Sequence, residues 1–93
     1  MYQVIASKQY QKALKKLVRA GLKKKVEEEI KDVIKLLASK KKLGAEYQDH
    51  QLQGELREYR ECHIQGDLLL VYQIIKDELV LVLVNIGTHS DLF

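Results

Sequence analysis

The sequence predicts an α+β domain in which two antiparallel N-terminal helices pack on a small, mainly antiparallel sheet. In the first half of the chain, apolar residues recur every three or four positions, which is the spacing of an amphipathic helix. In the second half they alternate or form short continuous runs, which is the pattern of strands. A chain of 93 residues has room for one hydrophobic core, so residues 1–93 are expected to form a single domain.

The first half begins with a short strand, expected over residues 2–6, where the sequence alternates loosely. Ser7 follows, and serine often caps the first turn of a helix. Amphipathic spacing then predicts helices over residues 8–20 and 23–39. Gly21 lies where the end of a helix favours a left-handed residue, so we expect the two helices to be antiparallel and joined there.

Residues 40–54 lack periodicity and contain two glycines, so they are expected to form a loop. Three strands are expected beyond this loop. The last two are apolar on both faces, which is typical of central strands that are covered on both sides. The expected strands span residues 56–64, 68–75 and 78–86, with turns at 65–67 and 76–77 and a short tail over 88–93.

The charges are divided unevenly between the two halves of the chain. Residues 1–46 carry 13 basic and 5 acidic side chains, a balance of +8. Residues 47–93 carry 3 basic and 8 acidic side chains, a balance of −5, which leaves the overall net charge at +3. A basic half of this size is able to hold phosphate backbones or an acidic protein segment, but it is equally compatible with a pair of solvated helical faces.

The composition also indicates a compartment. Cys62 is the only cysteine, so no internal disulfide is possible and a reducing, cytoplasmic environment is expected. The longest apolar runs are too short to span a bilayer, and we expect no membrane partner.

The residues that could carry chemistry are three histidines in the second half, His50, His63 and His89. RNA is cleaved without a metal when its own 2′-hydroxyl attacks the neighbouring phosphate, which requires a base, an acid and cations around the phosphorus. Histidine suits the proton-transfer roles because it titrates near neutrality, and arginine suits phosphate oxygens because its planar group binds two of them. From residue types alone, however, a single histidine is more often an ordinary surface or core residue, and three of them favour a functional role only modestly.

Two other chemistries fit the sequence less well. The pairs Asp49–His50 and Glu61–His63 are weak evidence for a metal site, because such a site needs a closely spaced set of ligands. Strand alternation places Cys62 on the face opposite Glu61 and His63, so we interpret it as a small packing residue and not as a nucleophile.

Four motifs occur in order along the second half of the chain: DHQLQG from residue 49, YRECHI from residue 59, DLLLVY from residue 67, and GTHSDLF over residues 87–93. Together they resemble the YafQ-type toxins of the RelE/ParE superfamily, and the expected helix pair is similar to that of their RelE-like microbial ribonuclease fold. The resemblance implies a toxin of a type II toxin–antitoxin system, which enters the decoding site of the 70S ribosome, contacts 16S rRNA and cuts mRNA. It implies no cofactor or metal, a 2′,3′-cyclic phosphate product, and a cognate antitoxin as a partner.

The resemblance also implies roles for individual residues. The three histidines look like the group that transfers protons and contacts the phosphate, and Asp67 looks like an auxiliary acid/base or orienting carboxylate. Phe93 resembles a terminal aromatic residue that positions a base, and Arg60 resembles either a phosphate clamp or a support for its strand. Glu61 departs from the pattern, because this group often has aspartate there. Nonspecific contacts to ribosomal RNA are expected from Lys8, Lys12, Lys15 and Lys16.

Simpler interpretations remain open for several of these residues. Asp67 follows a glycine, and the sequence alone favours a turn former there. Phe93 is also compatible with a simple cover for the end of the core. Two other functions also remain open, a non-catalytic ParE-like toxin that acts on DNA gyrase and an RNA-binding module. The gyrase alternative ranks lower because it gives the histidines no task.

Overall fold

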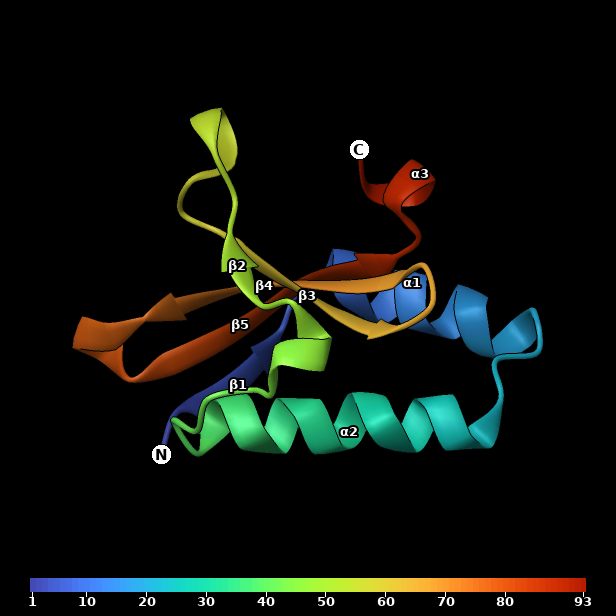
Figure 1. Cartoon of the computed structure of the whole chain (residues 1–93), viewed down its shortest axis with the longest axis horizontal. Helices are drawn as coiled ribbons and strands as arrows, with labels where there is room; N and C mark the ends of the chain where they lie inside the picture. Colours follow the sequence, from blue (N-terminus) through green and yellow to red (C-terminus); the bar gives the residue numbers. More distant parts are fainter.

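The computed structural model describes all of residues 1–93 and confirms the α+β class (Figure 1). The strands form one five-stranded sheet in the order β1-β5-β4-β3-β2, in which β1 is parallel to β5 and the other neighbours are antiparallel. The elements are β1 (Gln3–Ala6), α1 (Lys8–Arg19), α2 (Lys24–Ala38), β2 (His50–Gln51), β3 (Arg60–Gln65), β4 (Leu68–Ile75), β5 (Val80–Gly87) and α3 (His89–Leu92).

Both predicted helices form where the amphipathic spacing places them. Ser7 is the N-cap of α1: its hydroxyl oxygen accepts a hydrogen bond from the Tyr10 amide at 3.0 Å, and it donates to the Val84 carbonyl at 2.8 Å. This one side chain therefore ends β1, begins α1 and fixes both to β5. Gly21 has a φ of 97°, the left-handed conformation expected between the helices.

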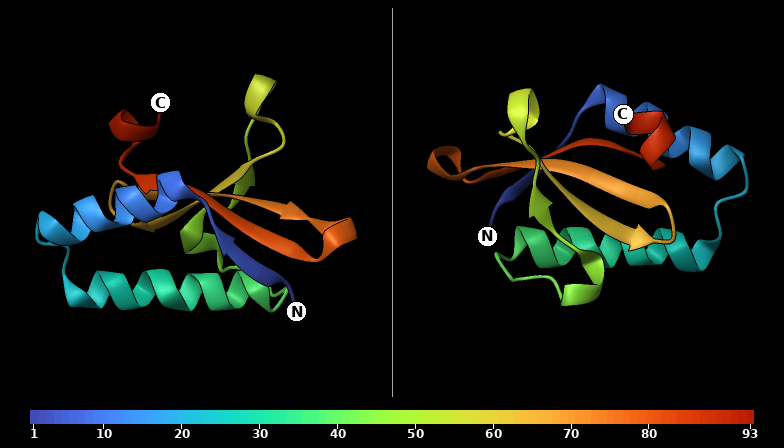
Figure 2. Two further views of the ribbon diagram at one scale, coloured as in Figure 1. Left: turned by 180° about the vertical axis from the view of Figure 1, so that it is seen from behind. Right: turned by 45° about the horizontal axis from the view of Figure 1, so that its top comes forward.

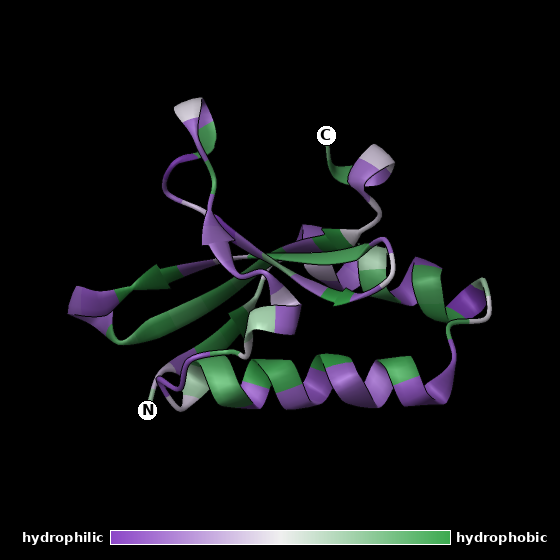
Figure 3. Ribbon diagram, in the orientation of Figure 1, coloured by the Kyte–Doolittle hydropathy of each residue, from purple (hydrophilic) through white to green (hydrophobic).

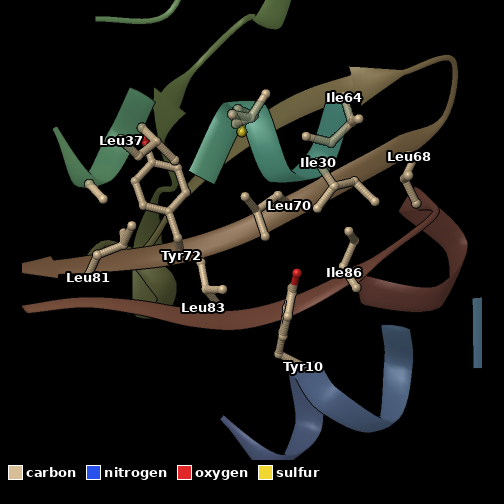
Figure 4. Close-up of a cluster of buried hydrophobic side chains, with 13 residues drawn as sticks. Tyr10, Ile30, Leu37, Ile64, Leu68, Leu70, Tyr72, Leu81, Leu83 and Ile86 are labelled. Atoms are coloured by element: carbon tan, nitrogen blue, oxygen red, sulfur yellow. The ribbon is translucent and has the colours of Figure 1, made fainter. Parts of the chain in front are cut away.

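The hydrophobic core lies between the two helices and one face of the sheet (Figures 2 and 4). Figure 3 shows that α2 turns its apolar side toward the sheet and its polar side away from it. Each fully buried aliphatic side chain contributes about 1.5–3 kcal/mol to folding relative to an exposed one. The core side chains labelled in Figure 4 are Tyr10, Ile30, Leu37, Ile64, Leu68, Leu70, Tyr72, Leu81, Leu83 and Ile86.

The opposite face of the sheet is covered only in part. Leu69 and Val71 of β4 are buried there, but no long helix lies over them. Instead, the segment around β2 and the C-terminal segment with α3 both rise from this side of the sheet, away from α2 (Figure 1). The expectation that β4 is covered on both sides is confirmed for its first five residues, whereas Gln73, Ile74 and Ile75 remain partly exposed. For β5 it is only partly right, because Val82 and Val84 remain partly exposed.

Three boundaries predicted from the sequence are wrong. The loop expected over residues 40–54 contains the strand β2, which is only two residues long and too short for a pattern to indicate. The next strand begins at Arg60 and not at residue 56, because residues Gly54–Leu56 form a 3-10 turn. The last strand begins at Val80 and not at residue 78, because Lys76–Glu78 form a 3-10 turn that ends at a left-handed Leu79.

The expected tail is also more ordered than predicted, since it contains the single helical turn α3. None of the helices combines the length and apolar composition that crossing a bilayer requires.

Candidate active site

The partly covered face of the sheet carries two rows of paired residues from adjacent strands. The first row runs from His50 of β2 through Glu61 of β3 and Val71 of β4 to Asn85 of β5. The second row consists of His63, Leu69 and Gly87, and it lies two residues away along the strands. Directly paired residues point to the same side of a sheet. His50 and His63 are therefore on one face of the sheet, and Glu61 lies beside His50 in the first row.

A cavity of about 290 Å³ lies over the second row. Three stretches of chain meet around it: β3, the turn between β3 and β4, and the start of α3. The structure thus brings together four of the residues singled out in the sequence, although up to 28 positions separate them along the chain, the distance from Glu61 to His89. The residues that line this histidine cavity are Glu61, His63, Gly66, Asp67, Leu69, Thr88, His89 and Ser90.

His50 does not line the histidine cavity, but its side chain contacts Glu61, which does. Its Nε2 lies 3.1 Å from Glu61 Oε1, and its Nδ1 lies 2.7 Å from the carbonyl oxygen of Gln48. A carbonyl only accepts hydrogen bonds, so Nδ1 is the donor in that contact. Both ring nitrogens therefore face oxygen atoms, and these two contacts fix the orientation of the ring. The His50 side chain is about half exposed, which leaves the ring accessible to a ligand.

Glu61 is the one charged residue that the fold buries, with 7% of its surface exposed. Its Oε1 contacts His50, but its Oε2 has no hydrogen-bond partner although it is buried. A buried carboxylate oxygen without a partner costs free energy, about 1–3 kcal/mol for polar groups in general. Glu61 also lines the cavity, so the unsatisfied carboxylate belongs to a residue at its wall.

His89 is positioned by a helix cap. The hydroxyl of Thr88 accepts from the Asp91 amide at 3.3 Å, and the Asp91 carboxylate accepts from the Thr88 amide at 3.1 Å. The hydrogen bond from the Thr88 backbone, together with that of its side chain, lowers the pKa of Asp91, so the cap is ionised and intact at neutral pH. His89 is the first residue of the capped turn, and its ring centroid lies 5.3 Å from that of Phe93, a half-exposed side chain.

Asp67 lies in the turn between β3 and β4, next to Gly66, which has a φ of 55°. The turn-forming interpretation of this position is therefore compatible with the structure, but Asp67 also lines the cavity beside His63. Its carboxylate is exposed and makes no hydrogen bond that would hold it away from a ligand.

Arg60 lies apart from the histidines. Its guanidinium is 3.3 Å from Asp49 Oδ2 and 3.3 Å from the Tyr72 hydroxyl, and that hydroxyl donates to the other oxygen of Asp49. Burial alone would lower the pKa of Arg60, but the hydrogen bonds to Tyr72 and Asp49 raise it above its ordinary value. Burial and the bond to Asp49 raise the pKa of Tyr72 as well, so the hydroxyl stays protonated. The three side chains fasten the segment before β2 to the sheet.

The predicted packing role of Cys62 agrees with its surroundings. The side chain is fully buried in the core, on the face opposite Glu61, and burial raises the pKa of its thiol to about 12. A thiol that stays protonated at neutral pH is a poor nucleophile.

The four lysines singled out on α1 are all exposed. Lys16 borders a second cavity, between α1 and α3, which Asp91 also lines. The other three, Lys8, Lys12 and Lys15, lie on the same helix, and none of the four lines the histidine cavity.

Sequence reasoning missed Thr88 and Asp49, two residues that hold functional candidates in place. Thr88 was detectable, because a threonine followed three residues later by an acidic residue is the signature of a capping box. Asp49 carried no comparable signal, since its partners Arg60 and Tyr72 are 11 and 23 positions away. No group of three or more histidine, cysteine, aspartate or glutamate side chains is arranged to hold a metal ion.

Two solved structures share this fold over nearly their full length. The structure described as a metal-bound toxin from Helicobacter pylori superposes with a TM-score of 0.88 at 45% identity and covers 100% of both chains. The toxin in the Escherichia coli DinJ–YafQ complex superposes with a TM-score of 0.84 at 30% identity, covering 100% of this chain and 99% of that one.

Sequence comparison leads to the same group. The mRNA interferase toxin YafQ of Escherichia coli K12 is 39% identical over 51 residues, which is 55% of this chain and 53% of that protein. The chain thus aligns with about half the length of the curated relatives it matches. The family described as "Bacterial toxin of type II toxin-antitoxin system, YafQ" matches residues 2–93. With that match spanning the fold and the histidine cavity, the chain belongs to the YafQ family of bacterial toxins.

Proposed function

We propose that this protein is an endoribonuclease that cuts mRNA on the ribosome by metal-independent attack of the 2′-hydroxyl on the neighbouring phosphate. The observation that carries the proposal is the convergence of His63, His89 and Asp67 around one cavity, with His50 beside it. The name of the Escherichia coli relative, an mRNA interferase toxin, supports the substrate class.

The reaction requires two proton transfers, and the cavity offers groups for both. One histidine takes the proton of the 2′-hydroxyl as its oxygen bonds to phosphorus. A second gives a proton to the 5′-oxygen as the bond between that oxygen and phosphorus breaks. The products are a 2′,3′-cyclic phosphate and a 5′-hydroxyl. The only histidine ring that hydrogen-bonds within the protein is that of His50, so His63 and His89 have their ring nitrogens free for substrate.

The remaining residues assist this reaction in the proposal. His50, held by Glu61 and the Gln48 carbonyl, contacts the phosphate and stabilises the charge that develops on it. Phe93, half exposed beside His89, offers a face on which a base stacks, worth roughly 1–3 kcal/mol. Arg60, committed to Asp49 and Tyr72, acts as a support for the site and not as a phosphate clamp.

Two macromolecular partners follow from the same proposal. The lysines of α1 contact ribosomal RNA when the toxin occupies the decoding site of the 70S ribosome. A cognate antitoxin binds and neutralises the protein, which the DinJ–YafQ complex of the similar Escherichia coli toxin supports.

The proposal is tested by in vitro translation with primer extension on the message. The variants His63→Ala and His89→Ala should each lose about a hundredfold to ten-thousandfold in cleavage rate. His50→Ala should lose about a hundredfold to a thousandfold, because it removes a group that stabilises charge. Glu58→Ala, an exposed change in the neighbouring loop, serves as the control and should cut normally. If all three histidine variants cut like the parent, the mechanism is wrong. Gyrase-linked DNA breaks would indicate a ParE-like toxin. If neither mRNA cuts nor DNA breaks are found, the remaining alternative is an RNA-binding module.

Metal independence is tested separately, because a similar toxin from Helicobacter pylori has been crystallised with metal. Toxin treated with EDTA and then desalted should cut at the same rate as untreated toxin in the same magnesium-containing translation mixture. Loss of activity that copper or zinc restores would contradict the proposed mechanism.

A further inference from the structure

The side chains of Asp49, Arg60 and Tyr72 form a closed ring of hydrogen bonds on the core face of the sheet. Arg60 donates to the Tyr72 hydroxyl and to Asp49 Oδ2, each at 3.3 Å, and the Tyr72 hydroxyl donates to Asp49 Oδ1. Arg60 and Tyr72 are directly paired across β3 and β4, whereas Asp49 belongs to the loop before β2. We call these three side chains the Asp49 anchor.

The Asp49 anchor is attached to the hydrophobic core through Tyr72. This residue has 1% of its surface exposed, and its ring lies among the core side chains (Figure 4). A hydroxyl in such surroundings costs free energy unless it is hydrogen-bonded, and Asp49 and Arg60 are its two partners. Asp49 is therefore held in place by a core side chain, although it lies in a loop.

His50 is the next residue after Asp49, and it lies on the opposite face of the sheet. It pairs with Glu61, whereas Arg60 and Tyr72 are paired on the core face. Consecutive residues of a strand alternate between the two faces, so a side chain fixed on one face determines where its neighbour emerges on the other. β2 has only two residues, so few backbone hydrogen bonds share this task with the anchor.

The residue before Asp49 links the anchor to the His50 ring directly. Gln48 has a φ of 47°, and its carbonyl oxygen lies 2.7 Å from His50 Nδ1. A residue other than glycine rarely adopts this left-handed conformation, so the surrounding contacts must hold it there. The peptide group that carries this carbonyl ends at the nitrogen of Asp49 and is planar, so a shift of Asp49 tilts the carbonyl away from the ring.

We propose that Asp49 and Tyr72 are positioning residues for the cleavage reaction, which act by fixing the His50 ring from the opposite face of the sheet. This inference rests on the proposed function, since that function makes His50 a residue that contacts the phosphate. It gives Tyr72 two tasks, packing through its ring and positioning through its hydroxyl. Neither positioning residue contacts the RNA.

The first experiment measures cleavage by Tyr72→Phe at saturating toxin, with primer extension on the message. The change removes the hydroxyl and retains the ring in the core. A misplacement of about 1 Å costs about a hundredfold in rate, and Arg60 still contacts Asp49 in this variant, so the expected loss is smaller, about tenfold. The matched control is Tyr10→Phe, which removes the same atom from another buried tyrosine, one outside the anchor. This control should cut normally.

A second variant tests the anchor without changing the core. Asp49→Asn alters a partly exposed side chain, and asparagine has one acceptor oxygen where the anchor uses two. Its cleavage rate should also fall by about tenfold or more. Asp77→Asn makes the same change at an exposed position in the turn between β4 and β5 and should cut normally. Urea denaturation establishes that each variant is folded under the conditions of the assay.

A double-mutant cycle separates positioning of His50 from general structural support. If the anchor acts through His50, adding Tyr72→Phe to His50→Ala should lower the remaining rate no further. An equal loss in the parent and in the His50→Ala background would overturn the inference. Normal cleavage by both Tyr72→Phe and Asp49→Asn would overturn it as well.

NMR measures the position of the His50 ring without any cleavage. The parent should show a nuclear Overhauser effect between this ring and the Glu61 side chain, because Nε2 lies 3.1 Å from Oε1. Tyr72→Phe should weaken that signal, and Tyr10→Phe should not. An unchanged signal in Tyr72→Phe would overturn the inference and leave the proposed function intact. If the parent makes no cut on the ribosome, the proposed function fails, and this spectrum alone decides whether the anchor fixes the ring.

Discussion

Glu61 is the residue at which the proposed function should come at a cost in stability. The fold buries its carboxylate, satisfies one oxygen with a half-exposed histidine and leaves the other without a partner. Replacing it with glutamine retains an acceptor for His50 and removes the buried charge. Strained or unsatisfied groups of this kind are commonly retained at functional sites at the expense of stability.

The variant Glu61→Gln should therefore raise the free energy of unfolding by about 1–2 kcal/mol while lowering the rate of mRNA cleavage. Urea denaturation at pH 7 measures the first quantity, and primer extension measures the second. Glu58→Gln, which changes an exposed glutamate in the same region, should alter neither. A Glu61→Gln protein that is less stable than the parent would mean that interactions within the folded protein, such as the contact with His50, outweigh the cost of burying the carboxylate.

Individual residues differ in how well the sequence alone predicts them. Strand alternation places Cys62 in the core and Glu61 and His63 on the other face, and the structure confirms this because period two is a direct property of a strand. Strand alternation could not decide whether Arg60 is a phosphate clamp or a support for its strand. Its environment depends on Asp49, which lies in a segment without any pattern.

The single turn α3 shows how a short element holds a reactive side chain. Four residues make too short a helix to be stable by themselves, so the position of His89 depends on the reciprocal hydrogen bonds of Thr88 and Asp91. Gly87 contributes too, since a Cβ there would lie 3.1 Å from that of Asp91.

Thr88→Ala should weaken this cap by about 1 kcal/mol. Because α3 lies at the end of the chain and outside the core, the midpoint of thermal unfolding should barely change, whereas cleavage should fall several-fold. Thr88→Ser retains the hydroxyl and should restore the rate. Equal cleavage by the alanine and serine variants would show that the cap does not position His89.

The elements that the sequence predicts well are those with many residues in one pattern. Both helices and β4 were located to within one or two residues, because their apolar residues follow a single period. β2 and α3 could not be located this way. β2 exists only because it pairs with β3, and α3 exists because of a cap, so each depends on contacts and not on periodicity.

At the scale of the whole molecule, the uneven distribution of charge predicts that different residues are responsible for ribosome binding and for cleavage. The lysines of α1 lie on the outer surface, and the titratable cluster lies over the sheet. Each phosphate that a lysine neutralises releases counterions, so binding through such lysines weakens as salt increases.

Changing Lys8, Lys12, Lys15 and Lys16 together to glutamine should weaken co-sedimentation with ribosomes, more so at higher salt, while cleavage at saturating toxin stays nearly normal. The matched control changes four exposed lysines of α2, Lys24, Lys25, Lys31 and Lys35, and so removes the same charge from the other helix. Normal co-sedimentation of the α1 variant across salt concentrations would mean that this basic surface is only solvated.

The pairing of β1 with β5 determines when, during synthesis, the protein becomes complete. Ser7 contacts Val84, 77 positions later, so the first strand finds its neighbour only after most of the chain has been made. Both helices leave the ribosome well before the strand on which α1 packs, and pairings between such distant segments form late. The histidine cavity requires β3 and α3 together and is assembled at the same late stage. A newly made chain thus passes through an interval in which its apolar residues are uncovered and its cavity does not yet exist, and a partner present during that interval meets the protein before it is able to act.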